Sequence, residues 1–231
     1  MPASISTSSL PTAIEHAVAE RSLLQHPFYL AWSRGELTEE QLTGYAKEYY
    51  HLARSVPAVM EAIAENLPTD ASHRTRATFA RQAEEEREHI ELWERFASSL
   101  GVTGEELEHY EPTATVQEAV SAIVEAASQG FEEGVAAMYA FECELPAISE
   151  SKIEGLRKFY GLSSENARAY FEEHLREEKH LCFWRELLRK FDGESMPSAL
   201  AAARATVTAQ NRVLDGVCER YCPGMGCACL R

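Results

Sequence analysis

The acidic residues of this chain restrict its secondary structure more than any other feature. Of the 37 acidic side chains, 34 are glutamates, and the only aspartates are Asp70, Asp192 and Asp215. Glutamate favours helices, whereas aspartate favours caps and turns. Valine and isoleucine are sparse and alanine is abundant, so strands lack the residues that they usually contain. The sequence therefore predicts an all-α protein.

Helix start and stop signals divide the chain into seven or eight helices. Thr38 precedes an acidic turn, and Thr103 and Thr115 each stand three residues before a glutamate, which is the capping-box pattern. Prolines inside two apolar stretches predict bends near Pro57 and Pro146. The predicted helices are 11–24, 38–66, 70–100, a short one from 103, 115–129, 134–159, 163–191 and 197–221. We expect one helical domain over residues 1–231, with a loose tail at 1–10 and a cysteine-rich tail at 218–231.

Charge and length exclude several classes of function. A net charge of −15 repels phosphate backbones and anionic lipids, so we expect neither a nucleic-acid nor a membrane partner. No apolar run approaches the ~20 residues of a membrane span, and the N-terminus lacks the features of a secretory signal. The six cysteines are therefore expected to be reduced, and the protein to be cytoplasmic.

Glutamate and histidine recur at a spacing that suits a metal site. A Glu-x-x-His pair places a carboxylate and an imidazole on one helix face. Eight histidines and 34 glutamates in 231 residues give about one such pair by chance, yet the chain has four. The pairs begin at Glu48, Glu86, Glu106 and Glu177.

Context separates these pairs. Glu86 and His89 share a face with Phe79, Ala83 and Trp93, which indicates that they enter the core. The pair at Glu106 lies in a short glycine-flanked stretch and is expected at the surface. The pair at Glu48 flanks two tyrosines and is expected to form a satisfied polar patch.

Two further features add candidate ligands. Glu142 follows an apolar run, where a carboxylate is costly unless it is paired or bound to metal. His174 and His180 lie on one predicted helix, with Glu177 and Glu178 between them. Two inward Glu-x-x-His pairs with additional carboxylates are typical of di-iron and di-manganese helical bundles. The alternatives to metal ligands are a buried ion pair at Glu142 and an exposed helix at 174–180.

Several stretches resemble the CADD family (Chlamydia protein associating with death domains), within the TenA/PqqC-like, haem-oxygenase-like helical fold. The similarity covers nearly the whole chain, including the cysteine-rich C-terminus. The stretches that carry it are HPFYLAWSRGELTEEQLTGYAKEYY at 26–50, HIELWERFASSLGVTGEELE at 89–108, GVAAMYAFECELPAISESKIEGL at 134–156 and YFEEHLREEKH at 170–180.

The resemblance implies a function and a set of site residues. Members of this family bind two metal ions and are implicated in forming para-aminobenzoate, a folate precursor, by oxygenating one of their own tyrosines. The sacrificed tyrosine corresponds to Tyr29, and the lysine thought to supply nitrogen corresponds to Lys152. The implied metal ligands are Glu86, His89, Glu142, His174, Glu177 and His180. The implied cofactors are two iron or manganese ions, with O₂ and an external reductant of unknown identity.

Two departures from the family pattern leave alternatives open. The interval between the first glutamate and His89 is shorter than usual, so Glu85 is a rival to Glu86. The late motif is one residue short and lacks its aspartate, so Glu177 keeps the spacing to His180 while Glu178 keeps the spacing to His174. If the helix were continuous, these residues would span too wide an arc for one site. We expect a local distortion or the loss of one ligand.

Three other interpretations compete with a dimetal oxygenase. These are a metal-free TenA-like hydrolase or binding protein, a ferritin-like carboxylate protein, and an interaction module that recruits death-domain proteins. The helix count disfavours the ferritin-like protein. The four cysteines of the tail, Cys218, Cys222, Cys227 and Cys229, suit a small thiolate metal site or a thiol relay, and a disordered end is the alternative. A homodimer is left open by the sequence.

Overall fold

The computed structural model describes residues 9–176, 178–191 and 193–225, and within these ranges every regular element is helical. One short 3₁₀ turn, η1, spans Leu23–Gln25. The α-helices in chain order are α1 (Leu10–Glu20), α2 (Pro27–Arg34), α3 (Glu39–Ala53), α4 (Val56–Glu65), α5 (His73–Ser99), α6 (Gly104–Glu108), α7 (Ala114–Ser128), α8 (Phe131–Glu142), α9 (Leu145–Phe159), α10 (Glu165–His174), α11 (Glu178–Leu188) and α12 (Met196–Tyr221).

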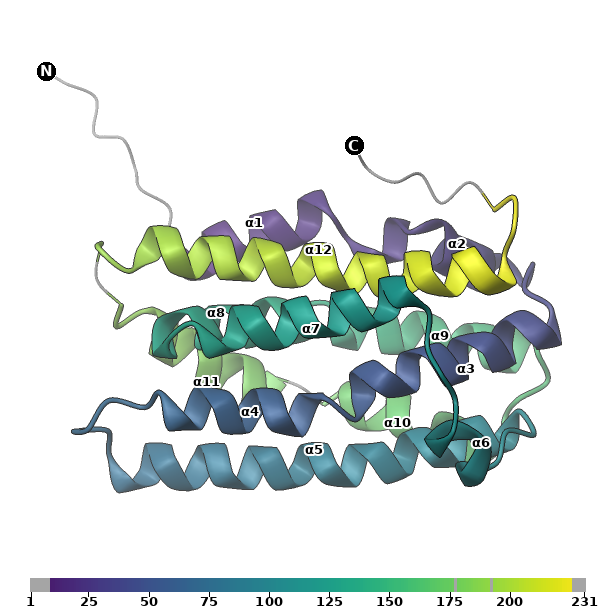
Figure 1. The fold of residues 1–231 in the computed structure, drawn as a ribbon, viewed down its shortest axis with the longest axis horizontal. Coiled ribbons are helices and arrows are strands. Elements are labelled where there is room, and N and C mark those ends of the chain that lie inside the picture. The colour runs from purple at the N-terminus through teal and green to yellow at the C-terminus, as the bar shows by residue number, and fades with distance from the viewer. Residues whose placement is uncertain (1–8, 177, 192, 226–231) are drawn as a thin grey trace, which may run out of the picture.

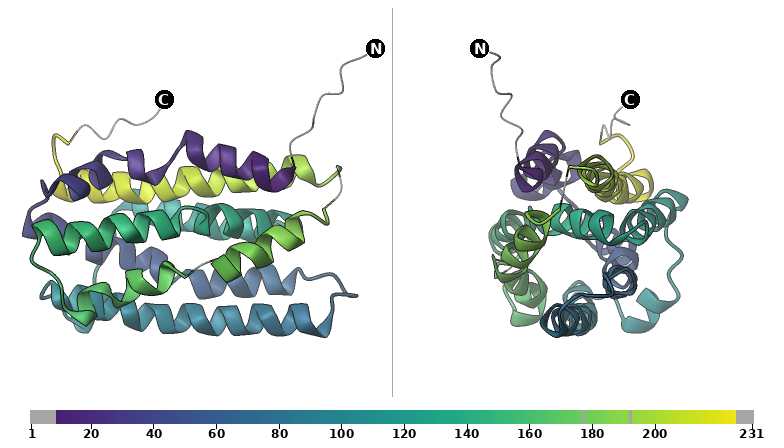
Figure 2. Two further views of the ribbon diagram at one scale, coloured as in Figure 1. Left: turned by 180° about the vertical axis from the view of Figure 1, so that it is seen from behind. Right: turned by 90° about the vertical axis from the view of Figure 1, so that its left-hand side faces the viewer.

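The helices lie side by side along one long axis and form an elongated bundle (Figure 1). Helix α12 packs chiefly against α7 and α8, whereas α5, on the opposite side of the bundle, packs against α3, α4 and α10. The end-on view shows the helices gathered around a common interior (Figure 2). The all-α prediction and its bundle architecture are confirmed.

Large aromatic side chains fill the interior of the bundle. Trp32, Trp93 and Trp184 are at most 1% exposed, and one continuous apolar cluster includes residues from α1 through α12. Polar side chains within this interior are few, and Glu86, Glu142 and others of the predicted site residues are among them. None of the described helices combines the length and the apolar character needed to cross a lipid bilayer.

Two of the predicted long helices are each divided in two. The stretch 38–66 breaks at Arg54 and Ser55 into α3 and α4, and the stretch 134–159 breaks between α8 and α9. Pro57 and Pro146 lie in the first turn of the second helix of each pair. A proline has no amide hydrogen to donate, and the first turn of a helix does not need one. The predicted bends are therefore helix starts.

The predicted helix 163–191 is also interrupted, close to the histidines of interest. Helix α10 ends at His174 and α11 begins at Glu178. The expected distortion of this segment is therefore present, and His174 and His180 stand on different helices. The break matters for the site because two separate helices can present two histidines in directions that one continuous helix would forbid.

Helix starts elsewhere follow the predicted caps with one correction. Thr38 and Thr103 both form capping boxes, the first with Gln41 and the second with Glu106. The cap predicted at Thr115 is wrong, because Thr113 accepts the hydrogen bond from the Val116 amide. Thr113 has the extended backbone conformation of a capping residue, whereas Thr115 lies inside the helix.

The C-terminal cysteines divide into two groups. Cys218 lies within α12 and Cys222 directly follows it, and both are buried at 3% exposure. Cys227 and Cys229 lie outside the described residues, as do residues 1–8 of the predicted N-terminal tail. Helix α12 ends at Tyr221, as predicted, before Pro223 and Gly224.

Candidate active site

Helix α5 contributes the first predicted ligand pair to the interior. Glu86 and His89 are each 8% exposed, on the same face as the fully buried Phe79 and Trp93. His89 Nδ1 and Glu86 Oε2 are 3.1 Å apart and share a hydrogen bond. The apolar stripe of α5 therefore carries this pair into the core, as the sequence predicts.

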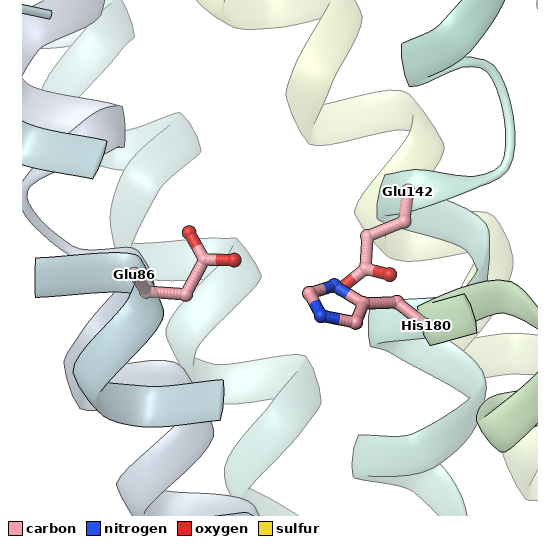
Figure 3. A group of neighbouring side chains, drawn as sticks. All are labelled: Glu86, Glu142 and His180. Carbon is pink, nitrogen blue, oxygen red and sulfur yellow. The ribbon is translucent and has the colours of Figure 1, made fainter. Parts of the chain in front are cut away.

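Glu86 of this pair converges with two side chains from two other helices. Glu86 of α5, Glu142 of α8 and His180 of α11 place ligand atoms within 4.8 Å of one another. Figure 3 shows the two carboxylates and the imidazole pointing into a common space. Trp184, one turn after His180, donates its indole N–H to Glu142 Oε2 at 2.8 Å. This hydrogen bond fixes the Glu142 carboxylate against α11.

A second group of predicted ligands adjoins the first. The imidazole rings of His89 and His174 lie edge to face with their centroids 4.8 Å apart. Tyr170, one turn before His174 on α10, contacts the His174 ring at 4.5 Å between centroids. Because His89 also shares a hydrogen bond with Glu86, the Glu86 carboxylate connects the two groups. Five of the six predicted ligands are thus neighbours.

The geometry distinguishes the rival glutamates. Glu86 belongs to the convergent group, whereas Glu85 is about one third exposed and pairs with Arg81 and with His180 Nε2, the latter at 3.3 Å. Glu178 is 76% exposed and contacts Arg185, so its side chain lies away from the site. Glu177 lies outside the described residues and stays a predicted ligand.

The donor atoms of these side chains suit an iron or manganese ion. Two carboxylates, Glu86 and Glu142, lie close together at 8% and 2% exposure, where their negative charges would repel one another. A cation placed between them removes that repulsion and compensates for their burial. Carboxylate oxygens with imidazole nitrogens suit iron and manganese better than metals that prefer thiolates. The residues present therefore fit the implied metal centre.

Tyr29 and Lys152 form a separate, aromatic pocket. Tyr29 of α2 is 5% exposed and Lys152 of α9 is 3% exposed. The Lys152 amine Nζ lies 4.2 Å from the centroid of the Tyr29 ring, 4.1 Å from that of Trp32 and 4.0 Å from that of Tyr45. The two residues implied by the resemblance, which are 123 positions apart in sequence, are therefore in contact.

This pocket changes the protonation behaviour of both residues. Lys152 Nζ is buried and has no hydrogen-bond partner among the described residues, so an ammonium would lose water and gain no acceptor. Burial lowers the pKa of Lys152 well below its ordinary value. Burial also raises the pKa of Tyr29 well above that of a free phenol. The pocket favours an uncharged amine beside an uncharged phenol.

A series of ring contacts joins the pocket to the ligand groups. The Tyr29 and Tyr45 hydroxyl oxygens are 3.4 Å apart. From Tyr45, ring centroids follow at 5.6 Å to Trp93 and 4.8 Å from Trp93 to Tyr170, which contacts the His174 ring. Oxidisable side chains thus stand between Tyr29 and the candidate ligands without interruption.

The family of the chain follows from its match to a family model. Residues 14–220 match the TENA/THI-4/PQQC family, which is nearly the whole chain. The chain belongs to the TENA/THI-4/PQQC family. The resemblance to TenA/PqqC-like proteins inferred from the sequence is thereby confirmed. The matched segment includes all of the predicted ligands and both residues of the aromatic pocket.

Relatives and a solved structure agree with this membership. A 4-aminobenzoate synthase of Chlamydia trachomatis is 34% identical, with 92% of each chain covered. A 4-aminobenzoate synthase of Nitrosomonas europaea is 31% identical, with 96% of each chain covered. A crystal structure from Shewanella denitrificans, described as having a heme oxygenase-like fold, gives a TM-score of 0.75 at 17% identity and covers 92% of this chain and 90% of its own. This structural match confirms the haem-oxygenase-like bundle.

The remaining Glu-x-x-His pairs serve the fold in this member of the TENA/THI-4/PQQC family. Glu48 is fully buried and accepts hydrogen bonds from the Tyr110 hydroxyl at 2.7 Å and the Thr113 amide at 3.0 Å, while pairing with Arg220 at 3.0 Å. This network ties α3 to the start of α7 and the end of α12. Glu106 caps α6 at the surface. The surface position of the pair at Glu106 is confirmed. The satisfied patch expected at Glu48 is confirmed for the carboxylate only, because His51 Nε2 is buried without a hydrogen-bond partner among the described residues.

Sequence reasoning missed several residues that shape the site. Trp184 was not predicted, although its position four residues after His180 places it on the same helix face. Trp32 and Tyr45 were not assigned to the pocket around Lys152. Their contacts join α2, α3 and α9, and no local spacing links residues so far apart.

Proposed function

We propose that this protein is an oxygen-dependent dimetal oxygenase that forms 4-aminobenzoate from its own tyrosine. The observation that carries the proposal is the contact between the buried Lys152 amine and the Tyr29 ring, in a chain with a convergent carboxylate and histidine group. The proposal is further supported by relatives 31–34% identical over nearly their full length that are named 4-aminobenzoate synthase.

One metal ion would be held by the convergent side chains Glu86, Glu142 and His180. A second would be held beside it by His89 and His174, with Glu86 shared between the two and Glu177 as a further predicted ligand. Iron or manganese ions bound in this way supply activation of O₂, with electrons from an external reductant. Burial of the ligands excludes bulk water from this chemistry.

Tyr29 has the carbon skeleton of the product. The 4-aminobenzoate molecule is a benzene ring with a carboxyl carbon and a nitrogen at opposite positions, and a tyrosine side chain has a methylene carbon and a phenol oxygen at those positions. Oxidation of the methylene carbon with cleavage of its bond to Cα would supply the carboxyl group. Replacement of the phenol oxygen by an amine would supply the nitrogen.

Lys152 is placed to supply that nitrogen: the phenol oxygen would leave as water when the ring C–N bond forms, and cleavage of the lysine Cε–Nζ bond would then release the nitrogen with the product. An amine attacks a carbon centre only in its uncharged form, and burial favours that form here. The ring oxidation that makes Tyr29 receptive to an amine can pass through Tyr170, Trp93 and Tyr45 by successive one-electron transfers, because these rings are in contact.

The decisive experiment is intact-mass measurement after single-turnover reaction. The parent protein, loaded anaerobically with iron and manganese and given O₂ and a reductant, should become lighter, with the loss of the tyrosine ring mapped to residue 29 and the loss of the amine nitrogen mapped to residue 152. Product should not exceed one equivalent per chain. Tyr29→Phe should abolish product while leaving metal content unchanged, because Tyr29 is not a proposed ligand. Lys152→Arg should also abolish product, because a guanidinium stays protonated.

The competing interpretations give different results in the same assay. A metal-free hydrolase or binding protein would purify without iron or manganese, and treatment with a chelator would not change its activity. An oxygenase with an external substrate would turn over many times per chain and keep full activity in the Tyr29→Phe variant. A death-domain partner would still be captured in a pull-down after the metal ligands are replaced.

A further inference from the structure

A buried glutamine on α5 has a hydrogen-bond acceptor that nothing in the described chain satisfies. Gln82 is 2% exposed, and its side-chain oxygen Oε1 is buried without a hydrogen-bond partner among the described residues. An unsatisfied carbonyl oxygen in the interior costs free energy that an apolar side chain of similar size would not. Buried polar groups are usually satisfied, so such an exception calls for a group beyond the chain itself.

Gln82 lies on the face of α5 that carries the candidate ligands. It precedes Glu86 by four residues and His89 by seven. At 3.6 residues per turn, those spacings place Gln82 about 40° around the helix from Glu86 and about 20° from His89. Gln82 is therefore one turn before Glu86, within the same inward stripe.

The neighbours of that stripe place Gln82 opposite α11. One turn before Gln82, the Phe79 ring packs against the Trp184 ring with centroids 5.6 Å apart. One turn after Gln82, Glu86 converges with His180. Position 82 thus faces the stretch of α11 between these two contacts. Trp184 donates its hydrogen bond to Glu142 from this same stretch.

We propose that the Gln82 side-chain oxygen is a further ligand, and a neutral one, of the metal ion held by Glu86, Glu142 and His180. This inference rests on the proposed metal centre. A carboxamide oxygen is a hard donor of the type that manganese and other oxygen-preferring cations accept. Because it carries no charge, it would add a donor atom without adding to the negative charge of Glu86 and Glu142, which are both buried.

The test replaces the amide by an apolar group of similar size and measures two quantities. Gln82→Leu should raise the melting temperature of the metal-free protein by about 2–4 °C, because an unsatisfied oxygen is removed. In the same variant, the dissociation constant for Mn²⁺ should rise at least about tenfold. An anaerobic titration that follows free Mn²⁺ by its paramagnetic resonance signal measures this constant. A stability gain accompanied by an affinity loss is expected for a ligand and not for a packing residue.

Two further variants keep the test independent of folding. Gln82→Met retains the length and loses the oxygen, so it should repeat the affinity loss. Gln82→Glu retains an oxygen, so Mn²⁺ affinity should be at least that of the parent. As a matched control, Gln210 is also buried, but its Nε2 donates to the Phe141 carbonyl at 3.1 Å. Gln210→Leu should therefore lower the melting temperature.

Two results would overturn the inference. If Gln82→Leu and Gln82→Met bind Mn²⁺ with the affinity of the parent, Gln82 is not a ligand, although the proposed metal centre stands. If the parent itself binds neither Mn²⁺ nor Fe²⁺, the metal centre and this inference both fail. The parent titration therefore separates the failure of the proposed function from the failure of this inference.

Discussion

At the scale of single residues, Lys152 is the side chain whose chemistry depends most on its surroundings. A lysine on the surface of α9 would be protonated, and an ammonium group is not a nucleophile. In the pocket, Tyr29, Trp32 and Tyr45 surround its amine at 4.0–4.2 Å from their ring centroids, and none of them accepts a conventional hydrogen bond from it there. The pocket therefore stabilises a reactive form of the residue while it destabilises the folded chain.

This cost gives a prediction with a definite pH dependence. Burial lowers the pKa of Lys152 below its ordinary 10.5 in the folded state, so the unfolded chain binds more protons between the two values. The parent should lose stability as pH falls from about 10.5 to the lowered pKa, and no further below it. Lys152→Met should remove this pH dependence of stability and raise the free energy of unfolding at pH 7 by on the order of 1–3 kcal/mol.

Urea unfolding of parent and variant across that pH range provides the measurement. Lys158→Met is the matched control, because Lys158 is exposed on the same helix, and its stability should follow the parent at every pH. A difference between parent and Lys152→Met that stays constant up to pH 11 would contradict the assigned cause, since the lysine would then be neutral in both states or in neither.

At the scale of elements, the break between α10 and α11 decides where the side chains of His174 and His180 lie. A continuous helix would sweep His174, Glu177 and His180 around an arc too wide for one centre. With the helix ending at His174 and restarting at Glu178, α10 directs its histidine toward His89 and α11 directs its histidine toward Glu142. One interruption thus reconciles the shortened motif with a compact ligand group.

The break predicts opposite outcomes for two neighbouring residues of α11. Glu178→Ala should leave the metal content of the purified protein unchanged, because its side chain is 76% exposed and contacts Arg185. His180→Ala should lower the content by about one ion per chain, because His180 belongs to the convergent group. Elemental analysis against protein concentration measures both. Equal losses in the two variants would mean that α11 starts in a different register when metal is bound.

At the scale of the whole molecule, the candidate site joins helices that are distant along the chain. Its convergent ligands come from α5, α8 and α11, and α12 packs on the far side of α8. A ligand that binds only the folded arrangement stabilises it by mass action. Metal bound at these residues should therefore stabilise the entire bundle and not a local segment.

Removal and return of metal should shift global unfolding. Chelated protein should unfold at a lower temperature than protein with Mn²⁺ at a hundred times its dissociation constant, a difference of about 2.7 kcal/mol in unfolding free energy. Scanning calorimetry should show one transition that moves as a whole. Glu142→Gln keeps the size of the side chain and an acceptor for Trp184, yet removes one charge, so its shift on Mn²⁺ addition should be smaller. An unchanged transition in the parent would contradict a metal centre at these residues.

Much of the fold could be predicted from local sequence because its causes are local. Excess glutamate, capping threonines such as Thr38 and Thr103, and prolines in first helical turns act within a few residues. The inward placement of Glu86 and His89 also followed from one helix face, since helical spacing fixes which residues share it. The boundary at Thr113 was missed, because only Thr115 stands three residues before a glutamate, whereas the residue three positions after Thr113 is Val116, which cannot complete a capping box.

The assembly of the site was decided by tertiary structure. Which of Glu85 and Glu86 meets Glu142 depends on how α5 is rotated against α8 and α11, and no local pattern encodes that rotation. The same holds for the tryptophan that holds Glu142, for the unsatisfied oxygen of Gln82, and for the three rings around Lys152. Sequence alone predicted most of the candidate side chains and the helix face that presents Glu86 and His89. Burial and contact, which set their charge and reactivity, exist only once the helices pack, because both depend on residues far apart in the chain.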